Sequence, residues 1–202
     1  TVSKEQKTAK KFLLIVVAAS CLVAAMFGSR NSLSLTIEGI DQSQTLNYLQ
    51  ISFAFALGQL VVGAISPFAG MIADKYGSGK TLTLGILLGL LGIILIPYST
   101  TAFTLSISLG VISSIGLGVA GLPVVLASVN RLIPQKKIGM AFGLVNAGQS
   151  LGQLILAPLA GFIIVNFGWV LCILFLSTVL LLVLPFCFIL RSRTDMKQPS
   201  GV

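Results

Sequence analysis

Six long apolar segments, separated by short polar turns, constrain the fold of this chain more than any other feature. A helix needs about 20 mostly apolar residues to cross a lipid bilayer, and each segment comes close to that length or exceeds it. Charged residues make up 9% of the chain, whereas soluble domains contain about 25%. The sequence therefore predicts an all-α membrane protein with six transmembrane helices, at roughly 12–30, 46–73, 81–97, 103–130, 139–165 and 170–190.

The basic residues divide the turns between these segments into two sets. Of the 13 Lys and Arg residues, 12 precede the first segment, follow the sixth, or lie in the second or fourth turn. Short cytoplasmic loops collect Lys and Arg, and the opposite turns hold only Glu38 and Asp41 as charged residues. We therefore expect both termini in the cytoplasm, with 1–11 as an N-terminal segment, 12–190 as the bundle and 191–202 as a tail or the start of an inter-domain linker. The net charge of +8 follows from this topology, and we expect no nucleic-acid partner.

The segment Gly77–Thr81, GSGKT, is similar to the end of a phosphate-binding loop. That loop needs a first glycine five residues before its Gly-Lys pair, so that backbone N–H groups can surround a phosphate between a strand and a helix. Asp74 stands at that position, and its carboxylate would repel a phosphate. We therefore expect no nucleotide site here.

The chain also lacks the residues that usually support catalysis or bind metal ions. The chain has no histidine, and its three cysteines lie inside apolar segments without metal-ligand spacing. A Ser nucleophile would have no evident base. We therefore expect no enzyme, no metal site and no cofactor.

The chain contains an internal repeat. SPFAGMIADKYG, residues 66–77, matches APLAGFIIVNFG, residues 157–168, at Pro, Ala, Gly, Ile and the final Gly, and LGQL occurs upstream of each copy. The match pairs the second segment with the fifth, three helices later, so the two copies cross the membrane in opposite directions. This pattern predicts an inverted repeat of three plus three helices, about 12–97 and 103–190, an arrangement typical of secondary transporters.

One copy of the repeat carries a family motif. The segment 70–77 resembles the loop motif of the major facilitator superfamily, with Gly70, Asp74, Lys75 and Gly77 at the motif's spacing. The whole chain resembles the amino-terminal six-helix half of that fold. Ser78 and Gly79 stand where the family usually has basic residues, which leaves Lys80 alone. Within the superfamily, three segments are similar to bacterial monocarboxylate and oxalate:formate antiporter-like members: 27–35, 51–77 and 139–161.

This resemblance implies a secondary active transporter that moves a small organic anion, a monocarboxylate, across the bacterial inner membrane by alternating access. Its partners would be the anion, membrane lipid, a coupling proton for symport or antiport, and a second six-helix half in the same polypeptide or in a partner chain. The tail from Gln198 onward is similar to the start of a linker between halves, which favours an excised half over a natural one. The alternative is a non-transporting scaffold or receptor subunit built on the same half-fold.

Arg30 is the one charge within the apolar pattern. A central Arg costs at least about 2.5 kcal/mol to insert, so such residues usually face a cavity and a functional partner. The alternative is an Arg at the outer end of its helix, which reaches the interface or pairs with Glu38. The resemblance favours the functional interpretation, because monocarboxylate transporters carry a basic residue late in the first span.

Polar side chains form stripes on two segments, whereas the third and sixth segments are apolar all round and are expected to face lipid or core. Such stripes either form hydrogen bonds between helices or line a cavity. On the fifth segment, Gly139, Gly143, Gly148 and Gly152 favour close helix contact. The candidate substrate-binding residues are Arg30, Asn31, Tyr48, Ser52, Gln59, Asn146, Gln149, Ser150 and Gln153. The resemblance adds a gating motif, in which Asp74 acts at the cytoplasmic gate: Gly70, Asp74, Lys75, Gly77 and Lys80.

Overall fold

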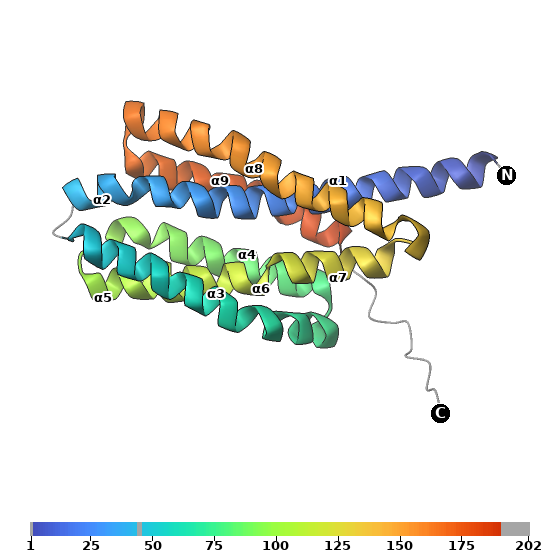
Figure 1. The fold of residues 1–202 in the computed structure, drawn as a ribbon, viewed down its shortest axis with the longest axis horizontal. Coiled ribbons are helices and arrows are strands. Elements are labelled where there is room, and N and C mark those ends of the chain that lie inside the picture. The colour runs from blue at the N-terminus through green and yellow to red at the C-terminus, as the bar shows by residue number, and fades with distance from the viewer. Residues whose placement is uncertain (1, 44–45, 191–202) are drawn as a thin grey trace.

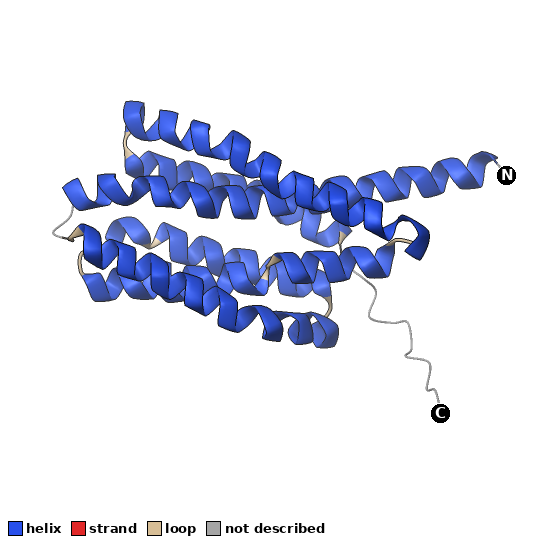
Figure 2. Cartoon of the chain, in the orientation of Figure 1, coloured by secondary structure: helices blue, strands red, loops and turns tan. Residues whose placement is uncertain are grey.

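A computed structural model describes residues 2–43 and 46–190, which form helices joined by short turns, with no strand among these residues (Figure 2). The helices are α1 (Val2–Leu33), η1 (Ser34–Thr36), α2 (Ile37–Ser43), α3 (Tyr48–Tyr76), α4 (Ser78–Ile94), η2 (Ile96–Tyr98), α5 (Ala102–Leu105), η3 (Ser106–Ser113), α6 (Ser114–Val119), α7 (Leu122–Leu132), η4 (Gln135–Lys137), α8 (Ile138–Phe167) and α9 (Trp169–Ile189).

Consecutive helices combine into six segments that are long and apolar enough to cross a membrane, which we number spans one to six. The all-α fold with six transmembrane helices is therefore confirmed. The spans are Ala9–Asp41, Tyr48–Tyr76, Ser78–Tyr98, Ala102–Leu132, Gln135–Phe167 and Trp169–Ile189.

The first span is longer than the sequence predicts. Helix α1 already begins at Val2, and the helical path continues beyond Arg30 through η1 and α2. Hydroxyl groups support this continuation, because Ser34 donates a hydrogen bond to the Asn31 carbonyl at 2.7 Å and Thr36 donates one to the Leu33 carbonyl at 2.7 Å. In the sequence, polar residues such as Ser34 and Thr36 look like the end of a helix. In the structure, their hydroxyls instead bond to backbone carbonyls of a helical path that continues.

The spans form two layers (Figure 1). One layer contains α1, α2, α8 and α9, and the other contains α3 to α7. The start of α1, the α3–α4 turn, the α7–α8 connection and the end of α9 lie at the same end of the bundle. The predicted tail, 191–202, lies outside the described residues. We call this end the basic end, because its turns and helix ends contain Lys10, Lys11, Lys75, Lys80, Arg131, Lys136 and Lys137.

The inverted repeat is visible in the backbone. Helices α3 and α8 run in opposite directions (Figure 1), and each has a proline inside, at Pro67 and Pro158. Each helix ends at a glycine with positive φ, 89° at Gly77 and 88° at Gly168, from which the next helix starts directly. The two copies thus share a helix, a proline and a turn at matching positions, which confirms the three-plus-three arrangement.

The two repeats interlock through their first spans. Helix α1 packs against α8 and α9 of the second repeat, while the fourth span packs against α3 and α4 of the first. Lipid tails are as apolar as Leu, so helices in a membrane associate where small residues let their backbones approach. A Cβ added at Gly152 would overlap the Ala24 backbone, and one added at Gly148 would overlap Ser20. Close contact of the fifth span is therefore confirmed for these two glycines.

Within this half, Gly139 and Gly143 make no such contact. A Cβ added at either position would meet nothing within 4 Å. At 3.6 residues per turn, five residues rotate the chain by about 140° beyond one full turn, so Gly143 faces away from the side that carries Gly148. The spacing of the four glycines places them on two different faces of α8.

Candidate functional site

A cavity of about 150 Å³ lies between the first, second and fourth spans, and polar side chains contribute much of its lining. It contains the one charged residue that sequence analysis places within the apolar pattern. Its lining residues are Arg30, Asn31, Leu33, Ser34, Phe55, Gln59, Leu109, Ser113, Ser114 and Leu117.

Arg30 lies well inside the first span. The span continues for 11 residues to Asp41, which at about 1.5 Å per residue corresponds to roughly 16 Å of helix. Its Nη2 donates a hydrogen bond to Oε1 of Gln59 at 2.5 Å. Arg30 thus faces a cavity across from α3.

The opposite wall of the cavity comes from a π-helical segment, η3, in the fourth span. The hydroxyl of Ser114 donates a hydrogen bond to the Leu109 carbonyl, five residues earlier, at 3.1 Å. Short π-helical segments are frequent at functional sites, because the extra residue per turn changes which side chains face a neighbour. Here the segment and the residue that follows it bring Leu109, Ser113 and Ser114 to the cavity that contains Arg30.

The structure brings three of the nine candidate binding residues together at this cavity: Arg30, Asn31 and Gln59. Tyr48 is the exposed first residue of α3, and Ser52 is half-buried one turn further along; neither lines the cavity. On the stripe of the second span, Ser66 donates its hydroxyl to the Val62 carbonyl of its own helix at 2.7 Å.

The stripe on the fifth span does not contribute to this cavity. Asn146 is exposed, and its amide donates a hydrogen bond to the Phe142 carbonyl within the same helix at 2.9 Å. Ser150 is also exposed, while Gln149 and Gln153 are half-buried beside the glycines that contact α1. These four residues therefore border an open face of α8 in this half of the fold.

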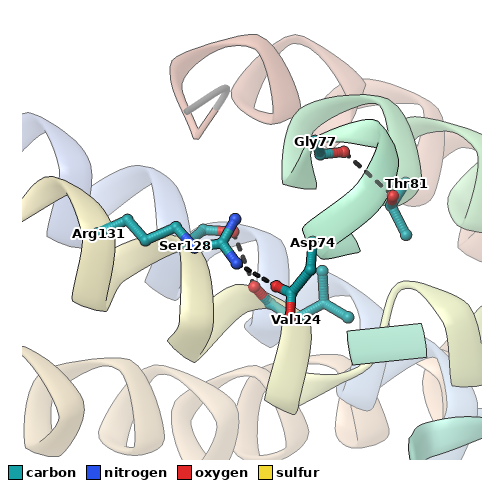
Figure 3. A network of polar contacts seen from close by, with 6 residues as sticks. All are labelled: Asp74, Gly77, Thr81, Val124, Ser128 and Arg131. Carbon is teal, nitrogen blue, oxygen red and sulfur yellow. Dashed lines mark hydrogen bonds and ion pairs between the residues drawn. The ribbon is translucent and has the colours of Figure 1, made fainter. Parts of the chain in front are cut away.

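At the basic end, Asp74 forms an ion pair with Arg131 (Figure 3). The pair joins the end of α3 to the last turn of α7, and its side chains are 64% and 38% exposed, respectively. Nearby hydroxyls bond within their own helices, Thr81 to the Gly77 carbonyl at 3.0 Å and Ser128 to the Val124 carbonyl at 2.7 Å. The pair thus fixes Asp74 against span four of the same half.

The remaining residues of the loop motif lie apart from this pair. The Lys75 ammonium lies 5.4 Å from the centre of the Tyr76 ring, and a Cβ added at Gly70 would meet nothing within 4 Å. Gly77 forms the positive-φ turn between α3 and α4. Lys80 lines a different cavity, against α9. The GSGKT segment joins two helices, whereas a phosphate-binding loop follows a strand.

Sequence analysis missed Arg131 as the partner of Asp74, although a signal existed. Asp74 is the only acidic residue between positions 42 and 190. Arg131 lies in the last turn of α7, and α7 packs beside α3, the helix that contains Asp74. The serines of η3 and α6 were also missed, because η3 has only 8 residues, too few to show a period of its own in the sequence.

Comparisons with known proteins agree with this architecture. Mouse monocarboxylate transporter 11 is 24% identical over 178 residues, which cover 88% of this chain and 39% of the relative. Human monocarboxylate transporter 2 is 27% identical, with 83% and 35% covered. The riboflavin transporter RibZ of Clostridioides difficile is 28% identical, with 79% and 34% covered. The chain therefore spans less than half the length of these relatives.

A solved structure shares the fold. The crystal structure of an auto-inhibited POT family peptide transporter superposes with a TM-score of 0.71 at 17% identity, covering 95% of this chain and 40% of that chain. The model of the Major Facilitator Superfamily matches residues 17–202. The chain accordingly belongs to the major facilitator superfamily of membrane transporters.

Proposed function

We propose that this chain is one half of a secondary active transporter that moves a small monocarboxylate by alternating access. The observation that carries the proposal is the guanidinium of Arg30, which lies within a membrane span and lines a cavity. A charged side chain inside a span is costly and usually belongs to a substrate or ion pathway. The membrane would be the bacterial inner membrane.

The chemistry of the cavity fits a carboxylate. An Arg side chain has five N–H donors in a planar fork that matches a carboxylate, and Gln59 accepts one of them. Asn31, Ser34, Ser113 and Ser114 supply further polar groups, while Phe55, Leu109 and Leu117 supply apolar surface. A cavity of about 150 Å³ holds a ligand the size of benzene, which suits an anion of about six non-hydrogen atoms.

A second six-helix half would complete the substrate path. Only 17% of the most apolar window of spans two and five is buried, compared with 56% and 67% for spans one and four. The exposed faces of these two spans carry Gln59, Asn146 and Ser150, and polar side chains in spans usually face protein or a water-filled cavity. We infer that α3 and α8 face the second half, in the same polypeptide or in a partner chain.

The basic end would face the cytoplasm, because short cytoplasmic loops collect Lys and Arg. Both described ends of the chain would then lie on that side, and Asp74 would act at the cytoplasmic gate. An exposed ion pair contributes only about 0–1 kcal/mol. The pair with Arg131 therefore serves to orient Asp74, while contacts with the second half would supply most of the closing energy.

The test is uptake of radiolabelled small monocarboxylates into proteoliposomes that contain the whole protein, with dicarboxylates and riboflavin as comparators. We expect saturable monocarboxylate uptake that an imposed pH gradient accelerates, because a proton is the proposed coupling ion. Substrate binding to the purified protein is measured in parallel. Folded protein that neither binds nor transports any of these compounds would favour the alternative, a non-transporting scaffold or receptor subunit.

A further inference from the structure

A second cavity, of about 370 Å³, lies between α4 and α9 at the basic end. It shares no residue with the cavity that contains Arg30. We call it the Lys80 groove; its lining residues are Gly79, Lys80, Thr83, Leu84, Leu87 and Phe188.

The Lys80 groove opens on the outside of the bundle. Leu84, Leu87 and Phe188 are 63%, 50% and 67% exposed, although they lie in apolar spans. Along α4, the exposed side chains beyond the groove are also apolar, Leu91 and Ile94. A helix surface of this kind in a membrane protein faces lipid. The natural occupant of such a groove is therefore a component of the bilayer.

The groove has one polar end and an apolar length. Lys80, Thr83, Leu84 and Leu87 follow the i, i+3, i+4, i+7 spacing of one face of α4. Seven residues of helix correspond to about 10 Å, roughly two thirds of the hydrocarbon depth of one leaflet. Lys80 is in the first turn of α4, next to the turn at the basic end. The ammonium therefore lies where a lipid headgroup begins, and the apolar side chains lie where its acyl chain continues.

The Lys80 ammonium is the one charged group among the lining residues of the groove. Within the described residues no carboxylate pairs with it, since the ion pair at the basic end joins Asp74 to Arg131. The only other polar side chain of the groove is that of Thr83, and its hydroxyl already donates to the Gly79 carbonyl at 2.9 Å. The groove thus presents one cation above an apolar surface.

We propose that the Lys80 groove binds an anionic phospholipid, with the headgroup phosphate on Lys80 and one acyl chain along Leu84, Leu87 and Phe188. Basic pockets between transmembrane helices bind anionic lipid headgroups in this way. A free phosphate would use the ammonium but none of the apolar length. The lipid would also bridge the third helix of each repeat, because α4 ends the first repeat and α9 ends the second.

The test uses the whole protein in nanodiscs, with Phe188→Trp as a reporter inside the groove and the parent protein as the baseline for Trp169. Quenching is compared between brominated phosphatidylglycerol and brominated phosphatidylcholine. One Lys near the membrane surface favours an anionic lipid over a zwitterionic one by about fivefold in affinity. We therefore expect stronger quenching by phosphatidylglycerol than by phosphatidylcholine. Lys80→Gln should remove this preference, whereas Lys75→Gln, an exposed neighbour that lies against Tyr76, should keep it.

Equal quenching by the two lipids, or a preference that survives Lys80→Gln, would overturn the proposal. Displacement by millimolar inorganic phosphate would also overturn it, because the site would then recognise a phosphate without the lipid. If Phe188→Trp does not fold, Leu84→Trp places the reporter in the same groove.

Discussion

Asp74 and Arg131, 57 residues apart in the sequence, form an ion pair that ties α3 to α7 at the basic end of the bundle. Both side chains retain contact with solvent, at 64% and 38% exposure. Exposed pairs contribute about 0–1 kcal/mol to stability. The position of the pair, where two spans end side by side, therefore matters more than its strength.

The first prediction separates the small contribution of this ion pair to stability from its proposed role at the cytoplasmic gate. Asp74→Asn and Arg131→Gln should each lower the apparent stability by no more than about 1 kcal/mol, because the pair is exposed. Both should slow transport several-fold, since the carboxylate is no longer held in place at the proposed gate. Lys136→Gln changes a basic residue in the same loop region and serves as the control. Initial rates of uptake and thermal unfolding are measured on the same preparations, and full activity of Asp74→Asn would exclude the gate.

The second prediction concerns Arg30. A hydrogen bond to a charged group contributes about 1.5–3 kcal/mol, which corresponds to roughly 10- to 150-fold in affinity. Arg30→Gln should therefore lose substrate affinity by that factor, and Arg30→Lys should lose less, because it keeps the charge without the planar fork.

Asn166→Ala is the matched control for Arg30. Asn166 is polar and lies in span five, but its amide donates to the Phe162 carbonyl of its own helix at 2.8 Å, and it does not line the cavity. The substrate affinity of Asn166→Ala should stay within about twofold of the parent, on the scale where 1.4 kcal/mol is tenfold. The measurement is equilibrium binding to purified, folded protein. An Arg30→Gln protein with unchanged affinity would place the guanidinium off the substrate path.

Sequence analysis predicts this fold well because apolar length and charge placement are local properties. The repeat can also be predicted from the sequence, because the turns at matching positions have a positive φ that favours glycine, at Gly77 and Gly168. Contacts between spans are harder to predict. Asn146 and Gln59 look alike as members of polar stripes, yet only Gln59 faces Arg30. That choice depends on helix rotation and on the π-helical register of η3, and neither leaves a periodic signal.

The third prediction uses the two positive-φ glycines. With φ of 89° and 88° and ψ of 137° and 164°, Gly77 and Gly168 lie in or near a backbone region that is essentially restricted to glycine. Gly77→Ala and Gly168→Ala should each cost about 1–3 kcal/mol. Gly63→Ala should leave the backbone of this half unstrained, because Gly63 is inside α3 and a Cβ there meets nothing within 4 Å in this half. Thermal unfolding in detergent measures all three, and an unaffected Gly168→Ala would show that the turn can adopt another conformation.

The fourth prediction tests how the repeats interlock. Gly152 lies so close to α1 that an added Cβ would overlap the Ala24 backbone, which cannot move as a flexible side chain would. Gly152→Ala should therefore push α8 from α1 and cost about 1–3 kcal/mol, as overpacking does in other tightly packed interiors. Gly143 is on the same helix but faces open space in this half. Gly143→Ala should leave the contact between α1 and α8 intact, because the added Cβ meets nothing within 4 Å in this half. If both variants unfold at the parent's temperature, the close contact between α1 and α8 does not hold the two repeats together.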